Sequence, residues 1–289
     1  MDTKLTGKTR IESDLIGARE IPAEALYGVQ TLRGIENFSI SKFRLSEYPL
    51  FIKGLAITKM AAMANFELGL LTVEQKDAII AACGEILDGK HHDQFPVDMI
   101  QGGAGTTTNM NANEVIANRA LELMGYERGE YQYCSPNDHV NCSQSTNDAY
   151  PTAIHIGMYF KHLQLLPHLE ELIASFRKKG EEFSQIIKMG RTQMQDAVPI
   201  RLGQEFKAYS VAIMRDIHRM DKAMDEMRTL NMGGTAIGTG INADEGYLRR
   251  IVPNLTEISG MDFIQAFDLI DSTQNLDPFV AVSGAVKAC

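Results

Sequence analysis

The segment from residue 146 to residue 188 constrains the fold most, because apolar side chains recur through it at helical spacing. At about 1.5 Å per residue, a helix of this length spans roughly 60 Å, whereas a compact globule of all 289 residues has a radius of gyration of only about 19 Å. We therefore expect the helix to protrude from its own domain. A helix that is apolar on two faces needs several neighbours, which predicts an oligomeric helix bundle. The two stripes are Ile156, Tyr159, Leu163, Leu166, Leu169, Ile173, Phe176, Phe183 and Ile187, and Ile154, Met158, Leu165, Leu172 and Ile186.

Helical signals also dominate the rest of the chain. Thr72 and Gln75 form a capping box at the start of one helix, and Gly89 and Gly125 are typical of helix ends. Further helices are expected over 50–68, 73–87, about 110–124, about 199–230, near 245–251, and from about 271 to the last residue. The pattern predicts a mainly all-α fold, with a small N-terminal helical domain over 1–145 and an incomplete long-helix bundle domain over 146–289.

Charge and composition argue against several classes of function. The formal net charge is −9, so no surface for nucleic acid or an anionic membrane is expected. No window approaches about 18 unbroken apolar residues, and the start MDTKLTGKTRIESDL lacks the apolar stretch of a secretory signal. The four cysteines show no paired spacing, which indicates reduced thiols and a cytoplasmic protein. No histidine pattern binds metal, so neither metal nor cofactor is expected, and His139 is kept as a candidate only because it lies in a polar loop.

A polar stretch immediately before the long helix is the first candidate for chemistry. Ser143, Ser145, Thr146 and Asn147 supply hydroxyls and an amide where the helix begins. Such side chains commonly cap a helix by accepting hydrogen bonds from its first free amides. Hydroxyl donors and free amides together also bind a small anion such as a carboxylate. Both interpretations stay open at this point, because adjacent residues can serve the two purposes.

Three further stretches have a related composition. In residues 102–109, Gly-Gly-Ala-Gly-Thr-Thr-Thr-Asn, glycines and then hydroxyls come before a helix. This stretch lacks the lysine of a phosphate-binding loop, so nucleotide binding is not expected. Residues 238–243 formally match GxGxxA, but a helix and not a strand precedes them, so turn glycines are the better interpretation. The linker 190–196 contains Thr192 and Gln193. No apolar pattern accounts for either side chain, so a functional role for this linker stays open.

Taken together, these stretches resemble the fumarase/aspartase superfamily over the whole chain. The N-terminal segment 27–38, Tyr-Gly-Val-Gln-Thr-Leu-Arg-Gly-Ile-Glu-Asn-Phe, is more similar to the aspartase branch than to the fumarases. So is Arg191-Thr192-Gln193, because fumarases and many relatives carry a histidine at the position of Gln193. The other motifs that carry the resemblance are Gly105-Thr106, Asn109 to Val115, Pro136 to Asn141, Ser143 to Asp148, Asp196 to Pro199 and Leu230 to Asn242.

The resemblance implies a small N-terminal helical domain, a long central helix bundle and a small C-terminal domain. It implies that four chains pack their central helices into one core, and that each active site is built from three of them. The implied reaction is the anti-elimination of ammonia from L-aspartate, which gives fumarate through a doubly charged aci-carboxylate. The residues that it assigns to substrate binding are Thr106, Ser145, Thr146, Asn147, Thr192 and Gln193, with Arg33 as a weaker candidate. His139 stays a possible site residue because of its polar loop alone.

One family feature does not occur in these 289 residues. Family members carry the catalytic serine, which removes the C3 proton, on a loop of the pattern Gly-Ser-Ser-x-Met-Pro-x-Lys-x-Asn, and no such stretch precedes Cys289. The sequence therefore reads as the N-terminal part of a complete enzyme, without the C-terminal domain, and we expect it to be inactive alone. Two alternatives stay open. One is a fumarate hydratase or another fumarate-forming lyase, against which Gln193 argues. The other is a non-catalytic structural relative, against which Thr106, Ser145, Thr146 and Thr192 argue.

Overall fold

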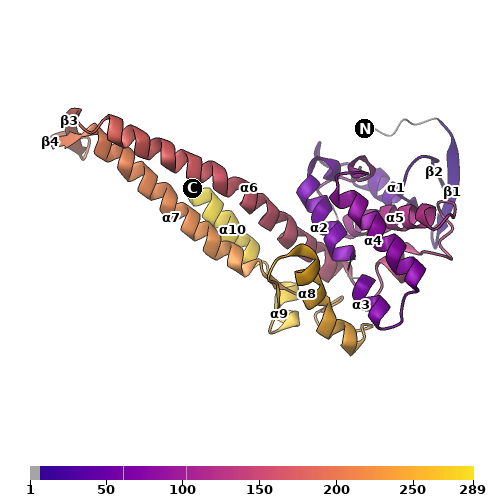
Figure 1. Ribbon diagram of the computed structural model, residues 1–289. Helices are drawn as coiled ribbons and strands as arrows, with labels where there is room; N and C mark the ends of the chain where they lie inside the picture. Colours follow the sequence, from indigo (N-terminus) through magenta and orange to yellow (C-terminus); the bar gives the residue numbers. More distant parts are fainter. Residues whose placement is uncertain (1–6, 61, 102) are drawn as a thin grey trace. The chain divides into compact units, whose positions relative to one another are not determined.

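The computed structural model describes residues 7–60, 62–101 and 103–289 (Figure 1). Two parts of the stretches discussed above lie outside the described residues. They are residues 1–6, which begin the segment where no secretory signal was expected, and Gly102 of the glycine run. The described residues are mainly helical, which confirms the predicted fold class, and two-stranded sheets accompany the helices. The chain divides into two compact units, the first formed by Met1–Met158 with Arg228–Asn275 and the second by Tyr159–Met227 with Leu276–Cys289.

These units do not follow the boundary expected between residues 145 and 146. The helix α6 (Thr146–Glu182) starts in the first unit and continues into the second. The segment Arg228–Asn275 also belongs with the N-terminal residues and not with the long helices. The N-terminal domain over 1–145 and the incomplete bundle domain over 146–289 therefore stay predictions.

The first unit is built around three helices that contact one another, α2 (Pro49–Lys59), α4 (Val73–Leu87) and α5 (Thr106–Leu123). Their facing side chains form one apolar core, in which Ile79 and Val115 are fully buried. Each such side chain contributes about 1.5–3 kcal/mol relative to an exposed one. The other elements of this unit are β1 (Thr9–Asp14), β2 (Gly17–Pro22), α1 (Val29–Asn37), η1 (Leu45–Glu47), α3 (Ala62–Glu67), η2 (His92–Gln94), η3 (Pro136–Val140), β5 (Thr229–Leu230), α8 (Glu245–Ser259), β6 (Ile264–Gln265) and α9 (Leu269–Gln274).

Local signals place the ends of α4 correctly. Thr72 Oγ1 accepts a hydrogen bond from the backbone N of Gln75 at 3.2 Å, and Gln75 Oε1 accepts one from the backbone N of Thr72 at 3.1 Å. Gly89, just after the helix, adopts φ 90°, a conformation that glycine reaches without steric cost. The predicted capping box and stop are both confirmed, because each depends only on residues a few positions apart.

Other predicted boundaries were wrong. The helix expected over 50–68 is divided into α2 and α3, and the last helix is divided into α9 and α10 (Asp277–Ala288). The helix expected from about residue 110 begins at Thr106, because Gly105 with φ 89° forms its N-cap. The short helix expected near 245–251 continues to Ser259, past an internal proline.

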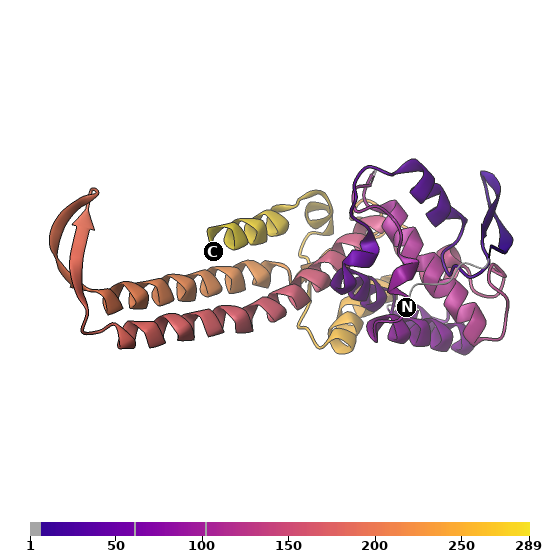
Figure 2. The same cartoon turned by 90° about the horizontal axis from the view of Figure 1, so that it is seen from above.

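The second unit consists of the remainder of α6, a hairpin of β3 (Ile187–Thr192) and β4 (Gln195–Arg201), α7 (Leu202–Glu226) and α10. Within it α7 runs alongside α6, and α10 packs against α7 (Figures 1 and 2). Aromatic rings join the two long helices, with the Phe176 and Phe206 centroids 6.2 Å apart and the Phe183 and Phe206 centroids 5.2 Å apart.

The long helix was predicted correctly, but its C-terminal boundary was not. It stops at Glu182 and not at Lys188, and residues from Ile187 pair with β4 in an antiparallel hairpin. Pro199, expected in the first turn of the next helix, lies in β4, and α7 begins at Leu202. Helical spacing continues through Phe183 and Ile187, but Phe183 lies in the turn after the helix and Ile187 pairs with Arg201 of β4.

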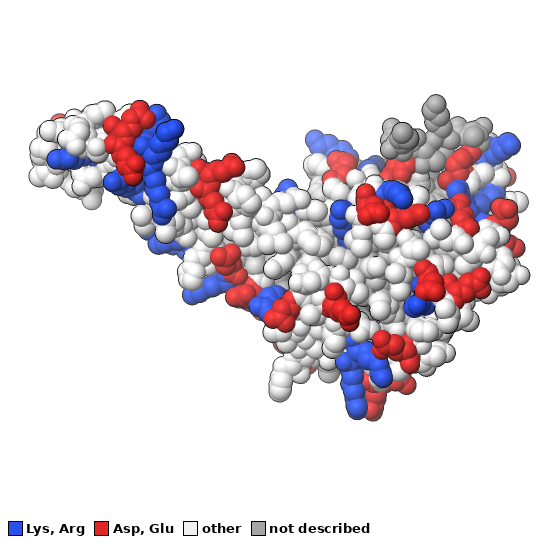
Figure 3. Space-filling view, viewed as in Figure 1, with Lys and Arg blue, Asp and Glu red and all other residues white. Residues whose placement is uncertain are grey.

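Acidic and basic side chains are interspersed over the face shown in Figure 3. In the part of the chain that the structure describes, no helix has the length and apolarity needed to cross a membrane. Cys83 and Cys134 are buried thiols, Cys142 is half-buried and Cys289 is exposed.

Candidate functional site

The polar stretch before α6 begins the helix with a side-chain cap. Ser145 Oγ accepts a hydrogen bond from the backbone N of Asn147 at 3.2 Å. The backbone N of Ser145 in turn donates to Asp148 Oδ1 at 2.9 Å. Ser145 is therefore the cap that the first interpretation of this stretch predicts. Capping does not explain the Thr146 side chain, because its hydroxyl contacts helix α5.

The start of α5 lies against the start of α6. Asn109 Nδ2, in the first turns of α5, donates to Thr146 Oγ1 at 3.1 Å. A Cβ atom at Gly105 would lie 2.5 Å from the ring of Tyr150, so only glycine allows this close approach. Thr106, the first and exposed residue of α5, is thereby placed beside the α6 start. Two helix N-termini meet at this point, and the first turn of each carries partial positive charge. Two of their amides already have side-chain acceptors, since Asn147 N donates to Ser145 Oγ and Thr108 N to Gln101 Oε1.

A fully buried lysine lies beneath this junction, and sequence reasoning missed it. Lys59 Nζ donates to Asn109 Oδ1 at 2.7 Å, to Asn141 Oδ1 at 2.9 Å and to Gln144 Oε1 at 3.0 Å. Burial lowers the pKa of this ammonium to about 7, with Asp148 acting in the opposite direction. The available signal was a lysine inside an otherwise apolar helical run.

Asp148 joins the α6 start to a distant loop, and it too was not predicted. Its Oδ2 accepts from the backbone N of Gly233 at 3.2 Å and of Thr235 at 2.9 Å. Burial raises the pKa of this carboxyl to about 6, although the backbone amides and Lys59 favour its ionised form. The glycine-rich segment is thus a turn that Asp148 binds, and the positive φ of Gly238 (86°) confirms its predicted turn glycine.

Asn147 contributes to the same connection. Its Nδ2 donates to the backbone O of Ala236 at 2.7 Å, and its own backbone O accepts from Asn231 Nδ2 at 2.9 Å. One amide hydrogen of Asn147 is therefore used within the protein. Of the predicted substrate-binding residues, the first unit brings together Thr106, Ser145, Thr146 and Asn147.

Thr192 and Gln193 belong to the second unit, at the tip of the β3–β4 hairpin. Thr192 pairs with Gln195, so Gln193 and Met194 form a two-residue loop, with φ 50° and 63°. Both central residues with positive φ are typical of a type I′ turn. All three side chains from Thr192 to Met194 are exposed.

The two weaker candidates have structural partners. Arg33 makes a paired hydrogen bond with Asp14, both contacts at 2.9 Å, and reaches the backbone O of Gly17 at 2.8 Å. His139 Nδ1 accepts from the backbone N of Ser135 at 2.7 Å, and burial lowers the pKa of the ring. These contacts hold the β1–β2 hairpin to α1 and close η3, and a role for either residue in substrate binding stays a prediction. Within residues 7–60, 62–101 and 103–289, no group of three His, Cys, Asp or Glu side chains could hold a metal ion.

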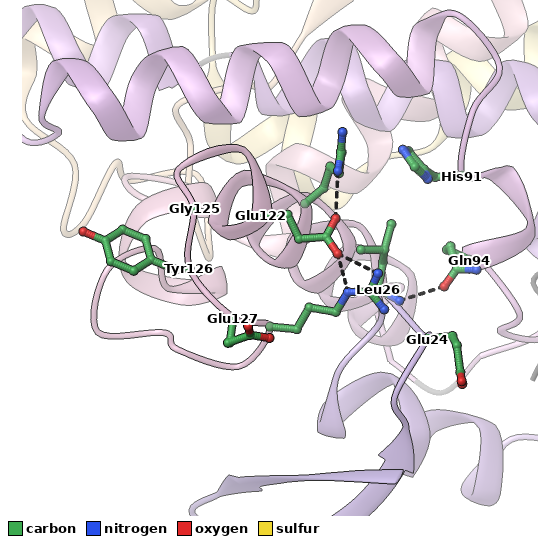
Figure 4. Close-up of a pocket in the computed structure, with 10 residues that line it drawn as sticks. Glu24, Leu26, His91, Gln94, Glu122, Gly125, Tyr126 and Glu127 are labelled. Atoms are coloured by element: carbon green, nitrogen blue, oxygen red, sulfur yellow. Dashed lines mark hydrogen bonds and ion pairs between the residues drawn. The ribbon is translucent and has the colours of Figure 1, made fainter. Parts of the chain in front are cut away.

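A separate hollow of about 740 Å³ lies in the first unit and is lined by none of the predicted residues (Figure 4). Both of its arginines are already paired with a carboxylate: Arg119 Nη1 lies 2.8 Å from Glu122 Oε2, and Arg128 Nη2 lies 2.6 Å from Glu122 Oε1. Paired charges of this kind offer a ligand little uncompensated attraction. The junction of α5 and α6 is therefore the better candidate site.

Comparisons with known proteins agree with the resemblance read from the motifs. A family model described as "Lyase" matches residues 17–289. The chain is 53% identical to an aspartate ammonia-lyase of Helicobacter pylori over 96% of the chain and 60% of that protein. It is 50% identical to the aspartate ammonia-lyase of Escherichia coli strain K12, over 98% of the chain and 60% of that protein. The chain thus spans about three-fifths of the length of these curated relatives.

Solved structures show the same fold. A crystal structure described as fumarate lyase:delta crystallin from Brucella melitensis bound to cobalt matches with a TM-score of 0.95 and 48% identity, over 97% of this chain and 61% of that one. A class II fumarase from Schistosoma mansoni matches with a TM-score of 0.91 and 33% identity, over 97% of this chain and 62% of that one.

Proposed function

Because the chain belongs to the lyase family whose model it matches, within the fumarase/aspartase superfamily, we propose that it forms the substrate-binding part of an aspartate ammonia-lyase. The proposed reaction is the reversible anti-elimination of ammonia from L-aspartate to give fumarate. Relatives named aspartate ammonia-lyase at 50% to 53% identity support this choice of substrate.

The observation that carries the proposal is the junction of α5 and α6. There the Thr106 and Thr146 residues place their hydroxyls at the starts of two helices, whose N-terminal turns carry partial positive charge. A substrate carboxylate placed at this junction would gain charge when the C3 proton leaves, because the electron pair moves into the carboxylate and forms the aci-carboxylate. Preorganised donors stabilise such developing charge, and the loss of one donor typically costs about 10²–10³ in rate.

The remaining parts of the proposal concern the complete enzyme. The proton acceptor is a serine on a loop that these 289 residues do not contain, so we expect the chain alone to release no fumarate. Thr192 and Gln193 would reach substrate from a different copy of the chain in a cytoplasmic homotetramer. We expect no cofactor, since the charge is stabilised by hydroxyls and amides.

Two alternatives have some support. A hydratase is the related enzyme class, because a solved fumarase shares the fold; Gln193, where fumarases carry histidine, favours the ammonia-lyase. A non-catalytic structural relative is the other, since one structural neighbour is described with the name delta crystallin. The hydroxyls at 106, 145, 146 and 192 favour a working site over a structural remnant.

The test uses the product of the complete coding region that contains these residues. Fumarate absorbance is followed with L-aspartate and, separately, with L-malate as substrate. We expect fumarate from L-aspartate and not from L-malate; activity on L-malate alone would contradict the proposal.

A matched pair of variants then tests the site. If Thr146 donates to the carboxylate, Thr146→Val lowers turnover by about two orders of magnitude with little change in melting temperature. Thr146→Ser keeps the hydroxyl and should retain most of the activity. Normal turnover of Thr146→Val with a lowered melting temperature would instead assign Thr146 to the folding of the helix start.

A further inference from the structure

The buried Lys59 determines which way three amide side chains face. An ammonium group has three hydrogen-bond donors and no acceptor. Each amide atom that meets Nζ must therefore be an oxygen, and Nζ lies 2.7 Å from Asn109 Oδ1, 2.9 Å from Asn141 Oδ1 and 3.0 Å from Gln144 Oε1. All three donors are used, so none of these amides can reverse without placing an N–H against the ammonium.

For Asn109 this orientation has a consequence at the candidate site. With Oδ1 held by Lys59, the Nδ2 group must face away from the lysine, and its hydrogens reach Thr146 Oγ1 and Asn141 Oδ1, both at 3.1 Å. The Thr146 hydroxyl thus accepts a hydrogen bond from Asn109. No described residue accepts the hydroxyl proton of Thr146 within hydrogen-bond distance, so that proton stays available for a ligand.

We propose that Lys59 and Asn109 are positioning residues that orient the Thr146 hydroxyl as a hydrogen-bond donor to the substrate carboxylate. The inference rests on the proposed function of Thr146. A hydroxyl that rotates freely can point its proton in several directions, whereas a hydroxyl that accepts from Asn109 Nδ2 has its proton turned away from residue 109 and free for the substrate. Such preorganisation removes a reorientation step as charge develops on the substrate.

The decisive variant is Asn109→Asp. The aspartate keeps an oxygen for Lys59 and nearly the same shape, but it replaces the amide donor that faces Thr146 with an acceptor. The Thr146 hydroxyl then donates to residue 109 and no longer to the substrate. In the complete enzyme we expect kcat for fumarate formation to fall about 100-fold, comparable with the loss from Thr146→Val.

A double-mutant cycle separates this effect from the added negative charge and from simple damage to the fold. If Asn109 acts through the Thr146 hydroxyl, Asn109→Asp changes kcat less than about 3-fold when Thr146→Val is already present. Additive losses, or normal turnover of Asn109→Asp beside an impaired Thr146→Val, would overturn the inference while leaving the proposed function in place. Normal turnover of Thr146→Val would remove the proposed role of Thr146, and this inference with it, while the proposed reaction on L-aspartate would stand.

Asn141→Asp is the matched control. Asn141 also contacts Lys59, at 2.9 Å, and the substitution adds the same charge next to the same ammonium. Its side chain donates to the backbone O of Gln144 at 3.2 Å and not to Thr146. We expect a kcat loss below about 10-fold for Asn141→Asp, and one that is undiminished in the Thr146→Val background. A loss equal to that of Asn109→Asp and abolished by Thr146→Val would assign the effect to the whole amide cluster and overturn the specific role of Asn109.

Discussion

At the scale of single residues, the carboxylate of Glu85 is held by two partners. Glu85 on α4 accepts from Arg119 Nε at 2.6 Å and from Arg119 Nη2 at 2.8 Å, and it lies 2.8 Å from His91 Nε2. The hydrogen bond from Arg119 lowers the pKa of this carboxyl from 4.5 to about 2. The side chain is 20% exposed, so solvent screens part of the interaction.

The shift predicts how stability depends on pH. The folded-state pKa of Glu85 lies below the unfolded value, so its stabilising effect is complete above pH 4.5 and is lost as the pH falls towards 2. We expect Glu85→Gln to lower the free energy of unfolding at pH 7 by roughly 1–2 kcal/mol and to have a smaller effect at pH 3. Denaturant unfolding at both values measures this, with the exposed Glu170→Gln as control. An equal loss at pH 3 and pH 7 would show that the ion pair is not responsible.

At the scale of elements, helix α1 receives its N-terminal cap from distant parts of the chain. Its own N-cap residue, Gly28, offers no side chain. Glu114 on α5 accepts instead from the backbone N of Gly28 at 2.8 Å, of Gln30 at 2.9 Å and of Thr31 at 3.0 Å. A buried carboxylate thus satisfies three amides that a helix leaves free.

Removing one carboxylate oxygen should therefore destabilise α1. Glu114→Gln places an NH₂ group against backbone N–H groups that have no other acceptor in the described contacts. We expect the free energy of unfolding to fall by about 1–3 kcal/mol, with faster hydrogen exchange of the α1 amides. Glu36→Gln near the other end of α1, where the pair with Arg19 is 48% exposed on both sides, should change it by less than about 0.5 kcal/mol. Similar losses from both variants would refute the capping role of Glu114.

The β3–β4 hairpin provides a second prediction at this scale. Met194 adopts φ 63°, a backbone conformation that is unfavourable for residues other than glycine. Its side chain is 96% exposed, so packing compensates little for this unfavourable φ. Met194→Gly should slow the hydrogen exchange of the hairpin amides, with a gain of roughly 0.5–1 kcal/mol. Met194→Ala keeps the unfavourable φ and serves as control. If both variants exchange alike, the turn is not under conformational strain.

At the scale of the whole molecule, the second unit exposes apolar side chains along its helices. They include Leu163 on α6, Tyr209, Val211 and Met214 on α7, and Val280 and Val286 on α10, each at least 44% exposed. An apolar surface of this kind is typical of a protein-protein interface.

We therefore expect the 289-residue chain to self-associate as its concentration rises. Light scattering across a concentration series measures this. Val211→Lys combined with Met214→Lys should shift the chain towards the monomer, whereas Val73→Lys, at an exposed apolar position in the first unit, should not. A monodisperse monomer of the unmodified chain would contradict the expectation.

The sequence by itself determined the features that depend on neighbouring residues. Helical periodicity indicated the two long helices, and the capping box at Thr72 and Gln75 placed the start of α4. The motif resemblance led to the family and named Thr106 and Thr146 as candidates, because motifs keep their residues in order along the chain.

Only the tertiary structure decided the features that depend on residues far apart. Lys59 and Asp148 became parts of the site because folding brings α2, α5, α6 and the 233–235 turn together, 85 positions separating Lys59 from Gln144. Glu114 became the cap of α1 for the same reason. The residues from Ile187 onward, which continue the helical spacing of α6, pair instead with β4. A buried charge or a free amide takes whichever partner packing places within reach, and local sequence does not specify that partner.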